Sequence, residues 1–174
     1  MLFKRIDHIG VFVDDLDEAQ KFLGETLGLE KVCSLHTPDR ADDVSYRCGD
    51  TAIEVIHFVQ QDEQAARLPA GAPARIDHIA FEVDDIGATA MALKGLGIAV
   101  TEPQKGFGFL FARAETGAVE GVRYDEKPFA LLFANTDPTT SDGVRYQLIQ
   151  RDGVTVDEAT ETQRPDSWQA SGRG

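Results

Sequence analysis

The chain has 174 residues, of which 42% are hydrophobic and 27% charged, enough for one substantial core. Its formal net charge of −13, without any Lys/Arg run, disfavours nucleic acids and anionic membrane surfaces as partners. The N-terminus lacks a secretory signal pattern, and no apolar stretch approaches the ~20 residues that span a bilayer. The two cysteines have no metal-finger spacing either. From these observations together we expect a cytoplasmic protein whose partner is a small molecule.

The first sixty residues predict a βαβββ module. An apolar run over 6–13 predicts a strand buried on both faces. Asp15 and Glu18 have the spacing of a capping box, which predicts a helix that ends at Gly28. Three further strands are predicted at 31–35, 44–48 and 51–59. The first module therefore covers residues 1–60.

A second module is predicted over residues 75–151. Residues 61–74 are rich in Ala, Pro and Gln, which is typical of a linker. After it come a strand at 76–83, a helix that begins at Ile86 and ends at Gly97, and a final strand at 144–150. The segment near 102–121 is longer than its counterpart and predicts an inserted hairpin or lid. Residues 152–174 form a polar tail.

The two modules begin with the same phrase, seventy positions apart (78 − 8). Arg-Ile-Asp-His-Ile starts at Arg5 in the first copy and at Arg75 in the second, so His8 and His78 occupy matching positions. Two copies of a unit related by a rotation can direct both histidines at one point. Two imidazoles at one point suggest a metal site.

Two residues on the last strand of each module extend this set. Glu54 interrupts an apolar run, where a lone ionised carboxylate needs a partner. Gln147 holds the matching position in the second module. With His8 and His78 these residues would give a nitrogen and oxygen ligand set open to further ligands, which suits Zn, Ni, Co, Mn or Fe(II).

Other interpretations remain open for some of these residues. An isolated strand histidine is usually a hydrogen-bonded core residue, and the alternative for Glu54 is a buried carboxylate paired with an arginine such as Arg47. His57 is three residues from Glu54, so it faces the other side of the strand and is interpreted as structural. The Asp14-Asp15 and Asp84-Asp85 pairs are explained as helix caps.

With these repeated phrases the sequence resembles the vicinal oxygen chelate superfamily, which includes glyoxalase I, methylmalonyl-CoA epimerase, extradiol dioxygenases and bleomycin-resistance proteins. The resemblance lies in the phrases at 6–11, 27–30 and 76–86, it extends over residues 4–151, and it is greatest to the epimerase branch. It implies an α+β fold in which two tandem βαβββ modules form an incompletely closed eight-stranded barrel with helices outside. It also implies that His8, Glu54, His78 and Gln147 are the metal ligands.

The resemblance further implies a divalent-metal-dependent epimerase or isomerase that moves a proton alpha to a carbonyl through a chelated enediolate. The substrate would be a small hydroxy-ketone, a cyclitol-like compound or an acyl thioester. Glutamine cannot accept a proton at useful pH, so Gln147 is not the base. Glu54 is the first choice, with Asp43, or its neighbour Asp42, as the second acid.

Three other functions stay open. His8, His78 and Glu54 amount to the two histidines and one carboxylate of an extradiol-type Fe(II) dioxygenase. A lyase of the glyoxalase I kind uses the same chemistry. A metal-free protein that sequesters small molecules such as drugs is consistent with the acidic charge. By analogy with the family we expect a homodimer.

Overall fold

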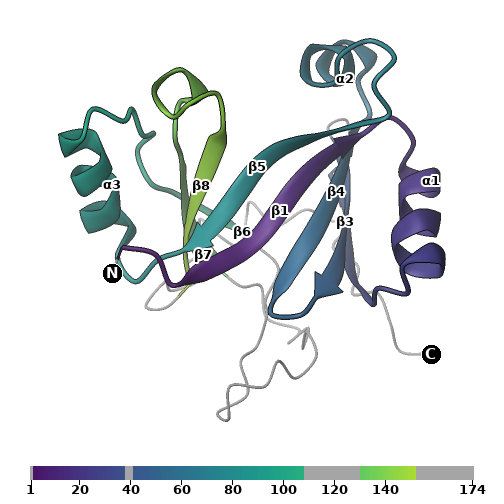
Figure 1. Ribbon diagram of the computed structural model, residues 1–174, viewed down its shortest axis with the longest axis horizontal. Helices are drawn as coiled ribbons and strands as arrows, with labels where there is room; N and C mark the ends of the chain where they lie inside the picture. The colour runs from purple at the N-terminus through teal and green to yellow at the C-terminus, as the bar shows by residue number, and fades with distance from the viewer. Residues whose placement is uncertain (1, 38–40, 108–129, 152–174) are drawn as a thin grey trace. The chain divides into compact units, whose positions relative to one another are not determined.

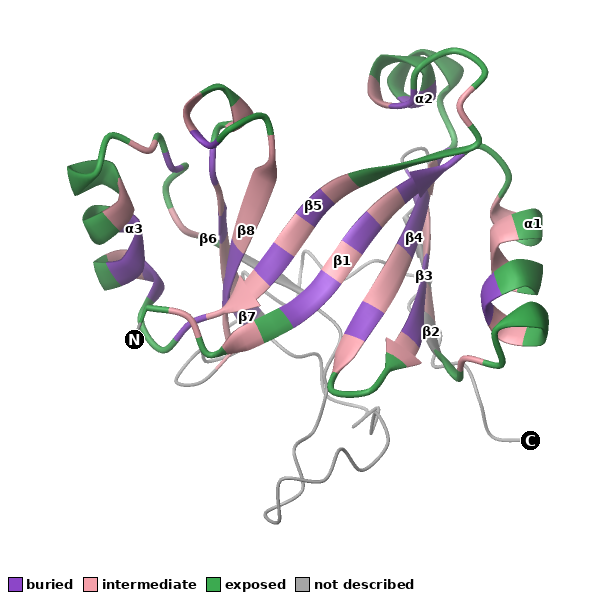
Figure 2. Ribbon diagram, in the orientation of Figure 1, coloured by how far each residue is buried: buried purple, intermediate pink, exposed green. Residues whose placement is uncertain are grey.

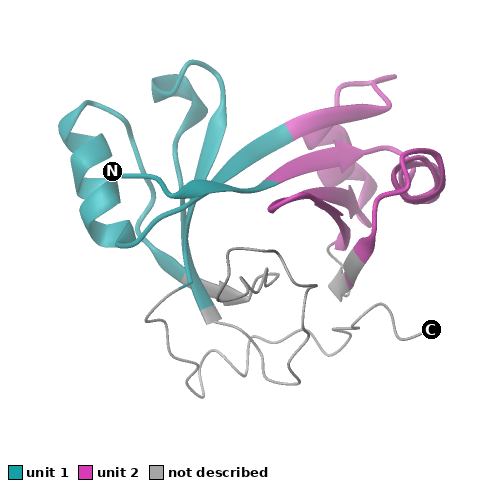
Figure 3. Cartoon of the chain, turned by 60° about the horizontal axis from the view of Figure 1, so that its bottom comes forward, with its two compact units in different colours: residues 1–8, 77–108, 125–164 teal, residues 9–76, 109–124, 165–174 magenta. Residues whose placement is uncertain are grey.

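A computed structural model describes residues 2–37, 41–107 and 130–151 of the chain. It divides into two compact units, shown in Figure 3. Unit 1 contains residues 1–8, 77–108 and 125–164, and unit 2 contains residues 9–76, 109–124 and 165–174. The first strand, β1 (Arg5–Val13), begins in unit 1 and ends in unit 2. The two units differ from the two predicted modules, because the start of β1 belongs to unit 1 and residues 75–76 belong to unit 2.

In the described part of unit 2, three strands follow one helix and precede another (Figure 1). The helix α1 (Leu16–Lys21) begins at Asp15, whose carboxylate accepts a hydrogen bond from the Glu18 backbone N–H, and it continues as a π-helical turn (Phe22–Thr26). Gly28, with φ of 68°, follows this turn in a left-handed conformation that favours glycine. The remaining elements are β2 (Lys31–Thr37), β3 (Ala41–Cys48), β4 (Thr51–Phe58) and α2 (Gln61–Arg67).

The sheet of unit 2 has two distinct faces. β2, β3 and β4 are antiparallel, and Ser45 pairs with Glu54 while Ala41 pairs with Phe58. One face packs against α1 through an apolar cluster centred on Val13, Leu23, Val44, Tyr46 and Val55. Because side chains alternate along a strand, the other face carries the opposite set of β3 and β4 residues, which includes Glu54.

Unit 1 has the same design. Its described elements are β5 (Ala74–Glu82, which begins in unit 2), α3 (Ile86–Gly95), β6 (Gln104–Phe107), β7 (Ala130–Asn135) and β8 (Arg145–Gln150). The buried face of α3 packs on a cluster that includes Val83, Val100, Ala134 and Leu148, and its other side is exposed (Figure 2). A second cluster, of Ala80, Leu131 and Ile149, lies on residues that alternate with these.

The strands hydrogen-bond in the order β2-β3-β4-β1-β5-β8-β7-β6, which is mixed and leaves β2 and β6 as edges. The α+β class and a sheet that is not closed agree with the expectation, and the arrangement of the strands as an incompletely closed barrel stays a prediction. The segment 61–74, expected to be a linker, contains the helix α2. Most of the predicted insert at 102–121 and all of the tail at 152–174 lie outside the described residues. Among the described helices, none has the length and apolar character to cross a bilayer.

Candidate metal centre

His8 on β1 and His78 on β5 face each other within unit 1. Their Nε2 atoms are 2.9 Å apart, and the two rings meet edge to face with centroids 5.0 Å apart. Both side chains are largely buried, with 11% and 7% of their surfaces exposed. The prediction that the repeat brings the two histidines to one point is therefore confirmed.

Each histidine is held by the aspartate that precedes it in the chain. His8 Nδ1 lies 2.9 Å from an Asp7 carboxylate oxygen, and His78 Nδ1 lies 2.9 Å from an oxygen of Asp77. A carboxylate can only accept, so each Nδ1 carries the proton and donates it. Each Nε2 is then left with a lone pair, and the two Nε2 atoms lie close together.

Two arginines from the far end of the chain fix the aspartates. Arg151 donates to both oxygens of Asp7, with a shortest distance of 2.7 Å, and Arg145 donates to both oxygens of Asp77 at 3.0 and 3.1 Å. Burial alone would raise the pKa of Asp7, but the hydrogen bond from His8 and the charge of Arg151 outweigh it and hold this pKa well below its ordinary value. Burial is also the main reason why the pKa of His8 is lowered, against the opposing influence of Asp7.

This arrangement fits a divalent cation between the two Nε2 atoms. Two lone pairs this close repel each other unless they share a proton or a cation. Two imidazole nitrogens bound at about 2.1 Å and at a right angle to one ion would be ~3 Å apart. The observed separation of 2.9 Å matches this value. Carboxylates that orient ligating histidines are also the usual outer partners of such ligands.

Glu54 belongs to unit 2, where it is half-buried on β4. Arg47, the example of an arginine partner for Glu54, instead lies 3.5 Å from Glu30. The place of Glu54 in the ligand set stays a proposal.

Two polar neighbours share the face of Glu54. Ser45 is paired with it across the β3–β4 ladder, and Asp43, on the same face, is the residue two positions before Ser45. The Ser45 hydroxyl is fully buried and has no hydrogen-bond partner among the described residues. A polar band of Asp43, Ser45 and Glu54 therefore crosses this face, and Asp42 lies on the opposite one.

Gln147 lies on β8, on the same face of unit 1 as His78. β5 and β8 pair in parallel, with His78 opposite Arg145 and Ala80 opposite Gln147. The Gln147 amide nitrogen donates to Asn135 Oδ1 at 3.4 Å. Within the described part of the chain, no donor contacts the amide oxygen, which is the atom that binds cations.

The remaining sequence predictions have mixed outcomes. His57 hydrogen-bonds the Val13 carbonyl at 3.2 Å, as a structural histidine would. The roles of Asp7 and Asp77 were missed, although both belong to the repeated phrase and precede the histidines in each copy. Arg145 and Arg151 were missed as well, and nothing in the local sequence marks them.

Comparisons with known proteins agree with this arrangement. Residues 7–112 match the model of the Glyoxalase/Bleomycin resistance protein/Dioxygenase superfamily. The human mitochondrial methylmalonyl-CoA epimerase is 30% identical over 92 residues, and the chain spans about half (52%) of its length. An ethylmalonyl-CoA/methylmalonyl-CoA epimerase of Cereibacter sphaeroides is 33% identical over 101 residues, which cover 55% of this chain and 73% of that protein.

Solved structures support the same fold. Methylmalonyl-CoA epimerase from Mycobacterium tuberculosis aligns with a TM-score of 0.63 at 18% identity, covering 86% of this chain and 89% of the other. The family match over most of the described residues, together with the paired histidines at the start of each half, shows that the chain belongs to the glyoxalase, bleomycin resistance protein and dioxygenase superfamily.

Proposed function

We propose that this protein is a divalent-metal-dependent epimerase or isomerase that moves a proton on the carbon next to a carbonyl. The observation that carries the proposal is the pair of buried histidines, whose Nε2 atoms are 2.9 Å apart and whose Nδ1 protons are held by aspartates. A structural histidine pair would not need two separately anchored carboxylates to expose both lone pairs.

The proposed ligands are His8, His78, Glu54 and Gln147. They supply two neutral nitrogens, one carboxylate and one amide oxygen, a set suited to Zn, Ni, Co, Mn or Fe(II) and short of a full octahedral shell. A divalent ion held by these residues would polarise a substrate carbonyl and stabilise the negative charge that develops on its oxygen.

The proton transfer needs a base that the chain itself provides. Glu54 is the first choice, because a carboxylate has two oxygens and can accept a proton on one while the other ligates. The bond from hydrogen to the alpha carbon breaks, its electron pair moves toward the carbonyl, and the proton goes to Glu54. Asp43, on the same face of the β3–β4 ladder, is the proposed acid that returns a proton to the carbon. Gln147 cannot take either role.

The substrates named for the relatives indicate a candidate substrate for this chain. The curated relatives are named for epimerisation of methylmalonyl-CoA, and one solved Streptomyces coelicolor epimerase holds 2-nitronate-propionyl-CoA. For this chain we therefore keep an acyl thioester beside a small hydroxy-ketone or cyclitol-like compound. The homodimer also stays a proposal.

The test is elemental analysis of the purified protein beside the variants His8→Ala and His78→Ala, with His57→Ala as the matched control. Proton–deuterium exchange at the alpha carbon is then measured in heavy water on a panel of hydroxy-ketones and acyl thioesters. We expect about one metal ion per chain and metal-dependent exchange, both lost in the two variants and retained in the control. Metal-free protein from cells grown with all five metals would contradict the proposal and favour a sequestering protein.

One second candidate is favoured by the donor set itself. Two histidines and one carboxylate are also the ligands of non-haem Fe(II) oxygenases. Oxygen consumption with catechol substrates by the Fe(II)-loaded protein separates this function from the first, because the proton transfer consumes no oxygen.

A further inference from the structure

Both ends of β8 contact the Asp–His pairs. Arg145 is the first residue of this strand, and its Nη1 donates to both carboxylate oxygens of Asp77. Arg151 follows the last residue of the strand, and its Nε and Nη2 donate to Asp7 at distances from 2.7 to 3.2 Å. All four residues belong to unit 1. One strand therefore holds the carboxylates of both copies of the repeated phrase.

The register of the sheet explains how β8 reaches both copies. β8 runs parallel to β5, with Arg145 opposite His78. The other end of β8 lies beside the end of β5, which binds the start of β1 through the ion pair between Glu82 and Arg5. The first arginine of β8 therefore lies beside the histidine of β5, and Arg151 lies where β1 begins.

The position of each carboxylate decides what its histidine can offer to a metal ion. In each copy one carboxylate oxygen lies 2.9 Å from the histidine Nδ1. A neutral imidazole has one ring proton, so a proton on Nδ1 leaves the lone pair on Nε2, and a proton on Nε2 removes that lone pair. A guanidinium that donates to the carboxylate fixes the place of the carboxylate, which in turn holds the proton on Nδ1.

The two arginine contacts differ in how readily water can replace them. The Asp7 side chain is fully buried and only 10% of the Arg151 side chain is exposed. In the other copy 33% of the Arg145 side chain is exposed. Water can therefore take the place of the Arg145 guanidinium more easily than that of the buried Arg151 guanidinium. His8 should depend on its arginine more than His78 does.

We propose that Arg145 and Arg151 are positioning residues, which keep the Nε2 lone pairs of both histidines available to a metal ion. They act through the two aspartates, so neither arginine touches the ion or the substrate. The proposal rests on the proposed function, because that function supplies the ion. The alternative is that the two arginines only stabilise the fold.

The experiment compares Arg145→Gln, Arg151→Gln and Arg151→Lys with the parent protein. The first measurement is the nitrogen chemical shifts of isotope-labelled histidine in the chelator-treated full chain, which distinguish the Nδ1–H from the Nε2–H tautomer. It is made at about pH 8, above the ordinary histidine pKa of ~6.5, and the signals are assigned with His8→Ala and His78→Ala. The second measurement is the affinity for Zn²⁺, by competition with a chelator of known affinity.

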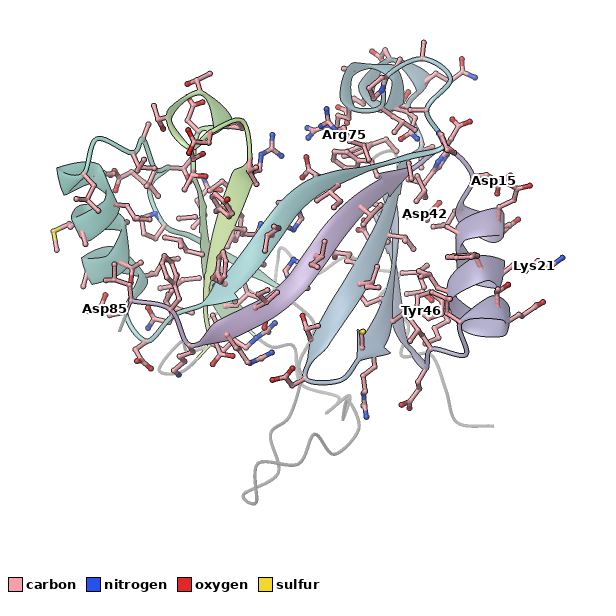
Figure 4. The ribbon with its side chains drawn as sticks, in the orientation of Figure 1. Asp15, Lys21, Asp42, Tyr46, Arg75 and Asp85 are labelled. Carbon is pink, nitrogen blue, oxygen red and sulfur yellow. The ribbon has the colours of Figure 1, made fainter. Side chains whose placement is uncertain are left out.

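A matched control separates positioning from stability. Asp85 caps α3 in the same unit, where its carboxylate accepts a hydrogen bond from the Ala88 backbone N–H at 2.9 Å (Figure 4). Asp85→Ala removes this cap, so it lowers the melting temperature without changing the Asp–His pairs or their arginines.

In the parent protein we expect both histidines to carry the proton on Nδ1. Arg151→Gln should convert a measurable fraction of His8 to the other tautomer and weaken Zn²⁺ binding by at least about tenfold, the low end for outer partners of a ligand. Arg145→Gln should act on His78 in the same direction by a smaller factor. Arg151→Lys should restore part of the loss, because lysine keeps the charge but not the planar fork. Asp85→Ala should leave both measurements as in the parent protein.

Two outcomes would overturn the proposal. The first is that either the tautomers or the Zn²⁺ affinity are unchanged in both Arg→Gln variants. The second is that Asp85→Ala changes them as much, which would assign the effect to stability alone. Melting temperatures show whether each variant is folded, and if Arg151→Gln does not fold, Arg151→Lys and Arg145→Gln provide the same comparison.

Failure of the proposed function looks different. A parent protein that does not bind Zn²⁺, but whose histidine tautomers still change in the Arg→Gln variants, would refute the metal centre. It would leave intact the control of the tautomers by the two arginines.

Discussion

The two copies of Arg-Ile-Asp-His-Ile have one sequence and two different surroundings. In the first copy Asp7 is fully buried, and two arginines, Arg5 and Arg151, contact it. In the second copy Arg145 binds Asp77, and a third of the Arg145 side chain is exposed (33%). The repeated residues thus produce the same Asp–His pair twice, while residues outside the repeat decide how firmly each pair is held.

The first arginine of each copy also has different partners in the two copies. Arg5 pairs with Glu82 at 2.8 Å, near the end of β5. Phe12 is the residue that matches Glu82 in the other copy (82 − 70), and there the guanidinium of Arg75 lies over a ring. Where the two copies differ at this position, an ion pair in one copy corresponds to a cation–π contact in the other.

The largest expected effect is on the two histidines themselves, and it should be equal in the two copies. His8→Ala and His78→Ala should each weaken metal binding by more than about 100-fold, because each removes one direct ligand and the loss exceeds that of an outer partner. Competition titration with a chelator of known affinity measures this. A loss in only one variant would show that the two histidines do not share an ion.

The next effect compares Glu54 with Gln147, the matching residues on the last strands of the two modules. Glu54→Gln should abolish deuterium exchange and weaken metal binding by about 10- to 100-fold, because it removes the only charged ligand proposed. Gln147→Ala should weaken metal binding by less than about tenfold, since a neutral amide contributes less. Parallel metal titrations and exchange assays check both, and a Glu54→Gln variant with full exchange would refute its role as base.

A smaller difference, in the free energy of unfolding, is expected between the variants of Asp7 and Asp77. Asp7→Asn leaves Arg151 buried without its charge partner and should destabilise the protein by about 3 kcal/mol. Asp77→Asn should cost about 1 kcal/mol, because solvent screens the partly exposed Arg145. Urea unfolding of the chelator-treated proteins measures the two values. Equal values would mean that the depth of burial does not distinguish the two copies.

The smallest effect is the pH dependence of the difference in stability between the parent protein and Asp7→Asn. The pKa of Asp7 is lowered in the folded protein, so its ionised form stabilises the fold at pH values above the unfolded pKa of ~3.9. This stabilisation is lost progressively as the pH falls below that value. The difference in melting temperature between metal-free parent protein and Asp7→Asn should therefore be constant above about pH 5 and shrink toward pH 3. A difference that grows on acidification would contradict the assignment.

Much of the local structure was predictable because it depends on neighbours in the chain. Asp15 caps α1 through the Glu18 N–H, and Gly97, with φ of 85°, follows α3, both as expected from sequence. The helix α2 was missed because Pro69, Gly71 and Pro73 follow the Ala- and Gln-rich segment closely, a composition that is typical of a linker.

The candidate site likewise contains some residues that the sequence predicts and others that it does not. His8 and His78 could be found because a repeat is visible in the letters, and strand periodicity then fixes the face on which each lies. Arg151 is 144 positions from Asp7, and no spacing rule predicts a contact over that distance. The ion pair of Arg47 with Glu30, in place of Glu54, likewise follows from packing.

The sequence by itself determined that two like halves each begin with an Asp–His pair on a strand, because alternation and capping act over a few residues. Only the tertiary structure decided that the two imidazoles meet at 2.9 Å, that Asp7 is held more firmly than Asp77, and that Arg67 and Arg75 both lie over Phe12. The physical reason is that these contacts join residues far apart in the chain, and their energies come from burial and charge pairing that exist only once the strands have assembled.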